Sequence, residues 1–212
     1  MDARISPSYS HEKVENPSFL DLVDVFEDLW RNYIFSPVWL LLNSPHGDIA
    51  AMTILCSYFE TIQSYMSGED SNHRSKEFFI KGFCQVFHSE SAGIEDAATA
   101  IYKHIRCGLA HEGMMTHKVN YSRAGAKAFF LTYPKNPNGS LNTHAGIASI
   151  ILNPLRVYQG VEQHFKIYLG KLRTAEDMGL CQAFRQTAER LWAVGTGENI
   201  VGMSEAEYLG CA

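Results

Sequence analysis

Apolar side chains recur at intervals of three and four residues along most of this chain, a spacing that aligns them on one face of an α-helix. Short polar segments rich in Gly, Pro, Asn and Ser separate these stripes, and strands do not alternate regularly with helices. The pattern favours a mainly α, up-and-down bundle of about six helices. The helices are expected over residues 18–36, 48–66, 75–88, 91–113, 153–172 and 174–192.

Several helix boundaries depend on single residues. Pro37 is expected to end the first helix, because proline disfavours helical geometry in the residue before it. The Asn153-Pro154 pair predicts a helix start, with Asn as the cap and Pro at the first position. Thr174 is the expected cap of the last helix, and Gly113 is the expected stop of the fourth. The apolar stripes of the first and last helices are Phe19, Leu22, Phe26, Trp30 and Tyr33, and Leu180, Phe184, Ala188 and Leu191.

The helical pattern is interrupted once, at about residues 126–152. There the stretches AKAFFLTY and GIASIILN flank KNPNGSLN, which contains a proline and an Asn-Gly pair. This arrangement predicts a small β-hairpin with a long loop. The chain is therefore expected to contain a flexible N-terminal segment over 1–17, one helical domain over 18–192 with the hairpin inserted, and a C-terminal tail over 193–212.

Charge and cysteine usage narrow the classes of partner and compartment. The formal net charge of −5 argues against a large basic surface for nucleic acid. The five cysteines form no CxxC pair, which is typical of reduced thiols in a cytosolic protein. The N-terminus has no apolar segment typical of a secretory signal, and no apolar run is long enough to cross a membrane. We therefore expect a cytoplasmic protein that does not enter a membrane.

The stretch RCGLAHEG, residues 106–113, carries the most distinctive chemistry. Its HEGMM portion begins like the zinc motif HExxH, but Met115 stands where the second histidine is required, so we expect no metal and no cofactor. Arg106 offers a fork of donors for phosphate oxygens, and His111 can transfer protons near neutral pH. Together they suffice for metal-free RNA cleavage, in which a base removes the ribose 2′-OH proton and a cation stabilises the phosphorane.

An Arg followed by a His at this spacing is expected about once by chance in such a chain. Arg4 and His11 also match the pattern, within the segment expected to be flexible. The second match differs in its context, because it lies at the end of a late helix in an α bundle. Gly108, inside that helix, is unfavourable by about 1 kcal/mol relative to alanine. It therefore predicts a close approach to the backbone, for example by a partner helix in a homodimer.

YKHIRCGLAHEG resembles the signature of the HEPN superfamily, in which an Arg precedes a His by a few residues near the end of a bundle helix. The segment CSYFETIQSYMSG is similar to the earlier HEPN helix that carries an acidic residue, here Glu60. The hairpin and the helix after it are similar to an extension found in some bacterial HEPN-like proteins. This resemblance covers residues 18–192 and implies a HEPN-like bundle with a hairpin insertion.

Many HEPN proteins are metal-independent ribonucleases whose two subunits contribute to one composite site. The resemblance implies a homodimeric endoribonuclease of the toxin or defence type, with RNA as substrate and an antitoxin-like protein as a partner. Arg106 would bind the scissile phosphate, His111 would act as acid or base, and Glu60 would orient one of them. Lys103, His104 and Cys107 would contact the substrate.

Two other interpretations stay open. Active HEPN members often have a polar residue, commonly Asn, directly after the Arg, whereas this chain has Cys107, whose thiol is a poor hydrogen-bonding replacement. That difference favours a non-catalytic HEPN-like module that binds a nucleotide or a protein. In the third interpretation, Arg106 forms an ion pair with Glu60 or Glu112, and His111 only ends a helix.

Overall fold

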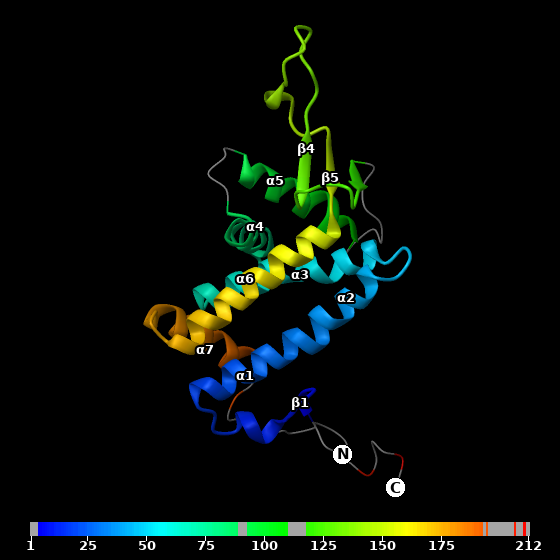
Figure 1. The fold of residues 1–212 in the computed structure, drawn as a ribbon. Helices are drawn as coiled ribbons and strands as arrows, with labels where there is room; N and C mark the ends of the chain where they lie inside the picture. Colours follow the sequence, from blue (N-terminus) through cyan, green and yellow to red (C-terminus); the bar gives the residue numbers. More distant parts are fainter. Residues whose placement is uncertain are drawn as a thin grey trace.

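The computed structural model describes residues 4–88, 93–109, 118–192, 194, 206 and 210, and it is mainly helical, as predicted. Figure 1 shows the helices forming the body of the molecule, with a small sheet at one end. The helices are α1 (Phe19–Leu29), α2 (Ser36–Leu42), α3 (Asp48–Ser67), α4 (Ser75–Val86), α5 (Ile94–Ile101), α6 (Pro154–Thr174) and α7 (Met178–Trp192).

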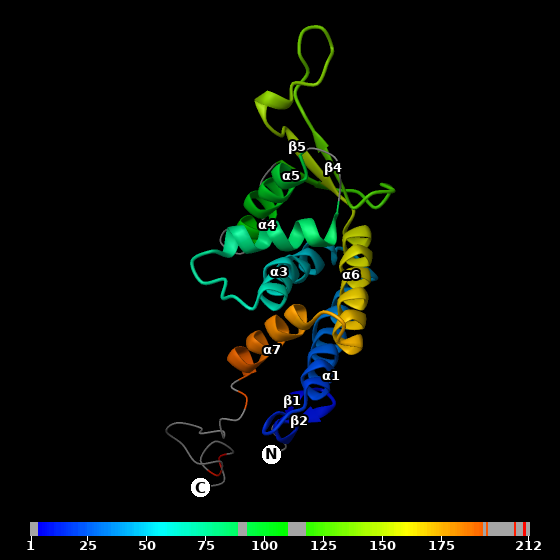
Figure 2. The same ribbon diagram turned by 90° about the vertical axis from the view of Figure 1, so that its left-hand side faces the viewer.

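Helix α3 is the central element of the bundle. It contacts α2, α4, α6 and α7, and Figure 2 shows α4 on one side of it, α7 on the other and α6 alongside. The apolar stripe that recurs at helical spacing along α3 is buried throughout, and the neighbouring Met52 and Phe59 are buried as well. The core is rich in aromatic side chains, and ring contacts connect α1, α3, α6 and α7. The stripe residues are Ala51, Leu55, Tyr58, Ile62 and Tyr65.

The predicted end of the first helix at Pro37 is wrong. Helix α1 continues through a π-helical segment, η2 (Trp30–Phe35), directly into α2, and Pro37 lies in the first turn of α2. The Ser36 N–H donates to the Arg31 carbonyl five residues back, so the helix is widened just before the proline. Because the π turn adds one residue, the buried face shifts: Tyr33 is 55% exposed, whereas Phe35 and Val38 are buried.

The predicted start of the last helix is also wrong by a few residues. Thr174 is the final residue of α6 and not a cap, because Ala175 turns into the left-handed region at φ 51°. The side chain of Asp177 instead accepts a hydrogen bond from the Leu180 N–H in the first turn of α7. Leu191, expected on the buried stripe, is 56% exposed.

The hairpin is confirmed, and a further strand joins it. Strands β4 (Phe129–Thr132) and β5 (Ser149–Leu152) pair antiparallel, while β3 (Val119–Tyr121) pairs parallel to β5 on its other edge. Asn153 follows β5 and caps α6 as predicted, with its side chain accepting from the Arg156 N–H. Strand β5 of the sheet therefore leads directly into α6.

The segment expected to be flexible contains regular structure from residue 4 onward. Strands β1 (Arg4–Ser6) and β2 (Tyr9–Ser10) pair antiparallel, and a 3₁₀ turn, η1 (His11–Val14), follows. Ser8 donates two hydrogen bonds to Asp28 of α1. The expected stop at Gly113 and most of the tail over 193–212 lie outside the described residues.

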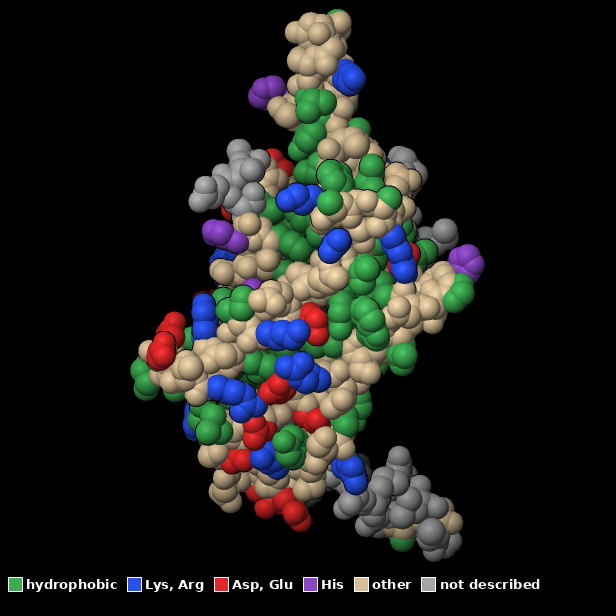
Figure 3. All heavy atoms as spheres, viewed as in Figure 1, with side chains coloured by type: hydrophobic (Ala, Val, Ile, Leu, Met, Phe, Trp, Pro, Cys, Tyr) green, Lys and Arg blue, Asp and Glu red, His purple; other side chains and the backbone are tan. Residues whose placement is uncertain are grey.

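The visible surface mixes both signs of charge. On the face shown in Figure 3, Lys and Arg side chains alternate with Asp and Glu over α1 and α6, where Arg173 pairs with Asp24 and Glu27. No helix among the described residues is long and apolar enough to cross a membrane.

Candidate functional site

Arg106 lies in an irregular part of its helix. Helix α5 runs into a π-helical segment, η3 (Tyr102–Arg106), in which the Cys107 N–H donates to the Tyr102 carbonyl five residues back. Such widened turns occur frequently at functional sites. The buried face of α5 continues through Ile101 and Ile105, so Arg106 lies beside the core face, with 30% of its side chain exposed.

Glu60 of α3 contacts Arg106, although 46 residues separate them. Its Oε2 accepts a hydrogen bond from Ser75 Oγ at 2.6 Å and a longer one from Arg106 Nη2 at 3.4 Å. Both side chains are partly buried, with 22% of Glu60 exposed. The carboxylate is thus held firmly by Ser75, and the guanidinium is held loosely by the carboxylate.

Tyr102 contacts both Arg106 and Ser75. Its ring centroid lies 5.7 Å from Arg106 Cζ, which is within cation–π range. Its hydroxyl donates to Ser75 Oγ at 3.5 Å. Ser75 begins α4, so three helices (α3, α4 and α5 with η3) contribute to one cluster of Glu60, Ser75, Tyr102 and Arg106.

The cluster borders a pocket of about 430 Å³. Helix α3 lines it with a row of hydroxyls at helical spacing, and the end of α7 contributes Arg190 and Leu191. The remaining lining comes from the loop after α3 and from Leu109. The polar lining residues are Thr53, Ser57, Glu60, Thr61, Ser64, Asp70, Ser71, Arg106 and Arg190.

Cys56 is the buried thiol of this pocket. Burial raises its pKa to about 12, and the nearby Arg106 charge offsets only part of that rise. Cys56 therefore stays protonated at neutral pH, and it contributes an apolar surface rather than a nucleophile.

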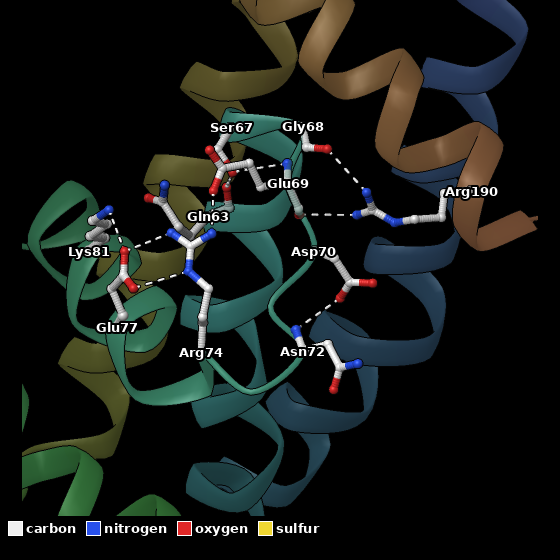
Figure 4. A network of polar contacts seen from close by, with 10 residues as sticks. All are labelled: Gln63, Ser67, Gly68, Glu69, Asp70, Asn72, Arg74, Glu77, Lys81 and Arg190. Atoms are coloured by element: carbon white, nitrogen blue, oxygen red, sulfur yellow. Dashed lines mark hydrogen bonds and ion pairs between the residues drawn. The ribbon is translucent and has the colours of Figure 1, made fainter.

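Arg190 of α7 also lines the pocket. Figure 4 shows its guanidinium pointing at the turn that follows α3, where it donates to the Gly68 carbonyl and to the Glu69 carbonyl, each at 3.1 Å. On the other side of that turn, Arg74 pairs with Glu69 and Glu77. The turn is therefore held from both sides.

The residues predicted from sequence divide into three groups. Glu60 and Arg106 line the pocket together. Lys103 is exposed and His104 and Cys107 are half-buried on the same helical segment, but they do not line this pocket. His111, and Glu112 with it, lie outside the described residues. Gly108 is buried within the chain itself.

Sequence reasoning missed Ser75, Tyr102 and Arg190. A signal was present for part of the pocket, because Thr53, Ser57, Thr61 and Ser64 form a hydroxyl row opposite the apolar stripe of α3. No comparable pattern marked Arg190, which lies on the polar face of an ordinary amphipathic helix.

No group of three or more His, Cys, Asp or Glu side chains within the described part of the chain could hold a metal ion. Comparison of the chain with models of known protein families, with curated proteins and with solved structures found no match. The site brings together one guanidinium, one carboxylate that contacts it, and a polar pocket beside them.

Proposed function

We propose that this chain is a HEPN-like, metal-independent endoribonuclease that acts as a homodimer. The observation that supports the proposal is the contact between Glu60 and Arg106 at the edge of a pocket. Arg106 would bind the scissile phosphate, Glu60 would orient its guanidinium, and His111 would act as acid or base. Their roles follow the resemblance of YKHIRCGLAHEG to the HEPN signature.

The geometry suits phosphate binding by Arg106. A guanidinium has five N–H donors, and the contact with Glu60 engages Nη2 alone, at a long 3.4 Å. The remaining donors make no hydrogen bond to a residue that the structure describes, and an arginine fork binds phosphate oxygens in pairs. Burial of part of the side chain strengthens that interaction relative to one in open solvent.

The test is cleavage of a structured RNA by the purified chain, with and without a metal chelator. We expect cleavage in both conditions, leaving 2′,3′-cyclic phosphate ends, because the 2′-OH is the attacking group. Arg106→Ala and His111→Ala should each abolish cleavage while leaving the thermal midpoint close to that of the wild type. Arg185→Gln, on the exposed surface of α7, is the control and should cleave normally. A folded wild-type protein that cleaves no RNA would refute the proposal.

The second candidate is a non-catalytic HEPN-like module that binds a nucleotide or a partner protein. A pocket of about 430 Å³ is within the usual range for small-molecule sites, and Cys107 in place of a polar residue favours binding without turnover. This candidate predicts that a nucleotide binds but is not converted. Equal nucleotide affinity in the wild type and in Arg106→Ala would count against it.

A further inference from the structure

Within the part of the chain that the structure describes, Arg190 is hydrogen-bonded only to neutral groups. Its two hydrogen bonds go to neutral backbone carbonyls, and it forms no ion pair with any described residue. Arg74, on the other side of the same turn, pairs with two carboxylates at 2.6 and 2.9 Å. Arg190 therefore lines the pocket without an ion pair to any described carboxylate, Asp70 and Glu60 of the same pocket included, and a cation in that state attracts anions.

The two carbonyl contacts also fix the guanidinium in place. With one donor of each terminal nitrogen engaged, the planar group is held against the turn after α3, and its remaining N–H groups donate to none of the described residues. A guanidinium fixed in this way loses little side-chain entropy when it binds an anion. The same contacts also cap the C-terminus of α3, so binding must be separated from this structural role by experiment.

Arg190 and Arg106 come from different elements and line the same pocket, with α3 between them. Helix α3 presents Ser57, Thr61 and Ser64 to the pocket, and their hydroxyls can hydrogen-bond to a sugar. Glu60 and Asp70 add acceptors suited to hydroxyl or amine donors of a ligand. The pocket combines two cations with several sugar-compatible groups, which suits a ligand that carries phosphate at two points of a sugar.

We infer that Arg190 is a second phosphate-binding residue, so that the pocket recognises two phosphate groups of one nucleotide unit. The inference rests on the proposed function, because both place a phosphate at Arg106. In an RNA chain, Arg106 binds the scissile phosphate and Arg190 binds the neighbouring one. The preferred ligand is thus an internal nucleotide with phosphate on both its 3′ and 5′ oxygens, rather than a terminal one.

The experiment compares the affinity of adenosine 3′,5′-bisphosphate with that of adenosine 5′-monophosphate by titration calorimetry at fixed salt. We expect the wild type to bind the bisphosphate about tenfold more tightly, as one added charge-assisted contact predicts. Arg190→Gln should reduce this ratio to near one. Arg185→Gln, which removes an exposed arginine from the same helix, should leave the ratio unchanged and so controls for net charge.

If Arg190 had a purely structural role, its replacement would change the affinities for both ligands by the same factor. The ratio of the two affinities, and not either affinity alone, therefore tests phosphate binding by Arg190. If Arg190→Gln does not fold, Arg190→Lys retains the charge without the fork and should give an intermediate ratio. A tenfold ratio that persists in either Arg190 variant, or a wild type that binds neither nucleotide, overturns the inference. Because binding requires no turnover, a ratio that depends on Arg190 in a protein that cleaves no RNA would refute the ribonuclease proposal alone.

Discussion

The close packing of α3 on α4 depends on Gly82, and its replacement by alanine is the most direct test of the architecture around the site. A Cβ built on Gly82 would lie 1.8 Å from the Phe59 carbonyl oxygen, a distance that real Cβ atoms do not adopt. The obstacle is the backbone of α3, which no change of side-chain rotamer can move. Helix α4 also carries Ser75, which holds Glu60, so the two helices must keep this separation for the site to form.

The magnitude follows from two opposing effects. Alanine in place of glycine stabilises a helix interior by about 1 kcal/mol. Forcing two packed helices apart by about 1 Å costs about 1–3 kcal/mol, and the upper end applies here because the contact is with backbone. We therefore expect Gly82→Ala to destabilise the fold by about 2 kcal/mol, which lowers the thermal midpoint by about 4–8 °C in a chain of this size.

Gly170→Ala is the matched control. Gly170 is an exposed residue inside α6, and a Cβ there would meet nothing within 4 Å. Gly170→Ala should gain only the higher helix propensity of alanine, so its thermal midpoint should rise by about 2–4 °C. Thermal unfolding followed by circular dichroism measures both variants. If Gly82→Ala is as stable as the wild type, or if both variants shift the midpoint in the same direction, the close approach of α3 and α4 is refuted.

Two further predictions concern α6. Burial lowers the pKa of His164 to about 4 from its usual 6.5, so the unfolded chain binds the proton more readily, and this residue's contribution to stability is present above pH 6.5 and lost as pH falls toward 4. Chemical denaturation at pH 7 and at pH 4.5 measures the free energy of unfolding. Between these two pH values, it should fall by about 2–3 kcal/mol less in His164→Gln than in the wild type. Asn153→Ala removes the cap of α6 and two hydrogen bonds to the carbonyls of Arg123 and Gly125. It should cost about 2–3 kcal/mol by urea denaturation, and Asn153→Asp, which keeps the capping oxygen, should cost less.

The bundle was predictable because its signals are local. The apolar stripe of α3 and the Asn-Pro start of α6 each depend on residues within one helix, and both are confirmed. The errors arise where tertiary structure overrides a local rule. Pro37 continues a helix because a π turn precedes it, and β3 joins the sheet through pairing with residues 31 positions away at Val119 and Ile150.

The site was predictable only in part, for the same physical reason. Arg106 and Glu60 stand out individually, since each is a charged residue on a helix with a clear apolar face. Ser75 and Arg190 reach the site only through the packing of α4 and α7 against α3, and nothing in their own segments marks them. The π turn of η3, which sets the direction of Arg106, likewise has no local sequence signature.

The arginines of this chain differ in how completely their charges are satisfied, and that difference points to the pocket. Arg123 and Arg173 each contact a carboxylate at 2.6 Å, which is typical of arginines that join structural elements. Among the described residues, Arg106 has one carboxylate contact, at 3.4 Å, and Arg190 contacts backbone carbonyls alone. If both residues served only to stabilise the fold, shorter ion pairs would do so better. Incomplete pairing of two arginines within one pocket instead suits the anion-binding role that we propose, because strong internal pairing would compete with the ligand.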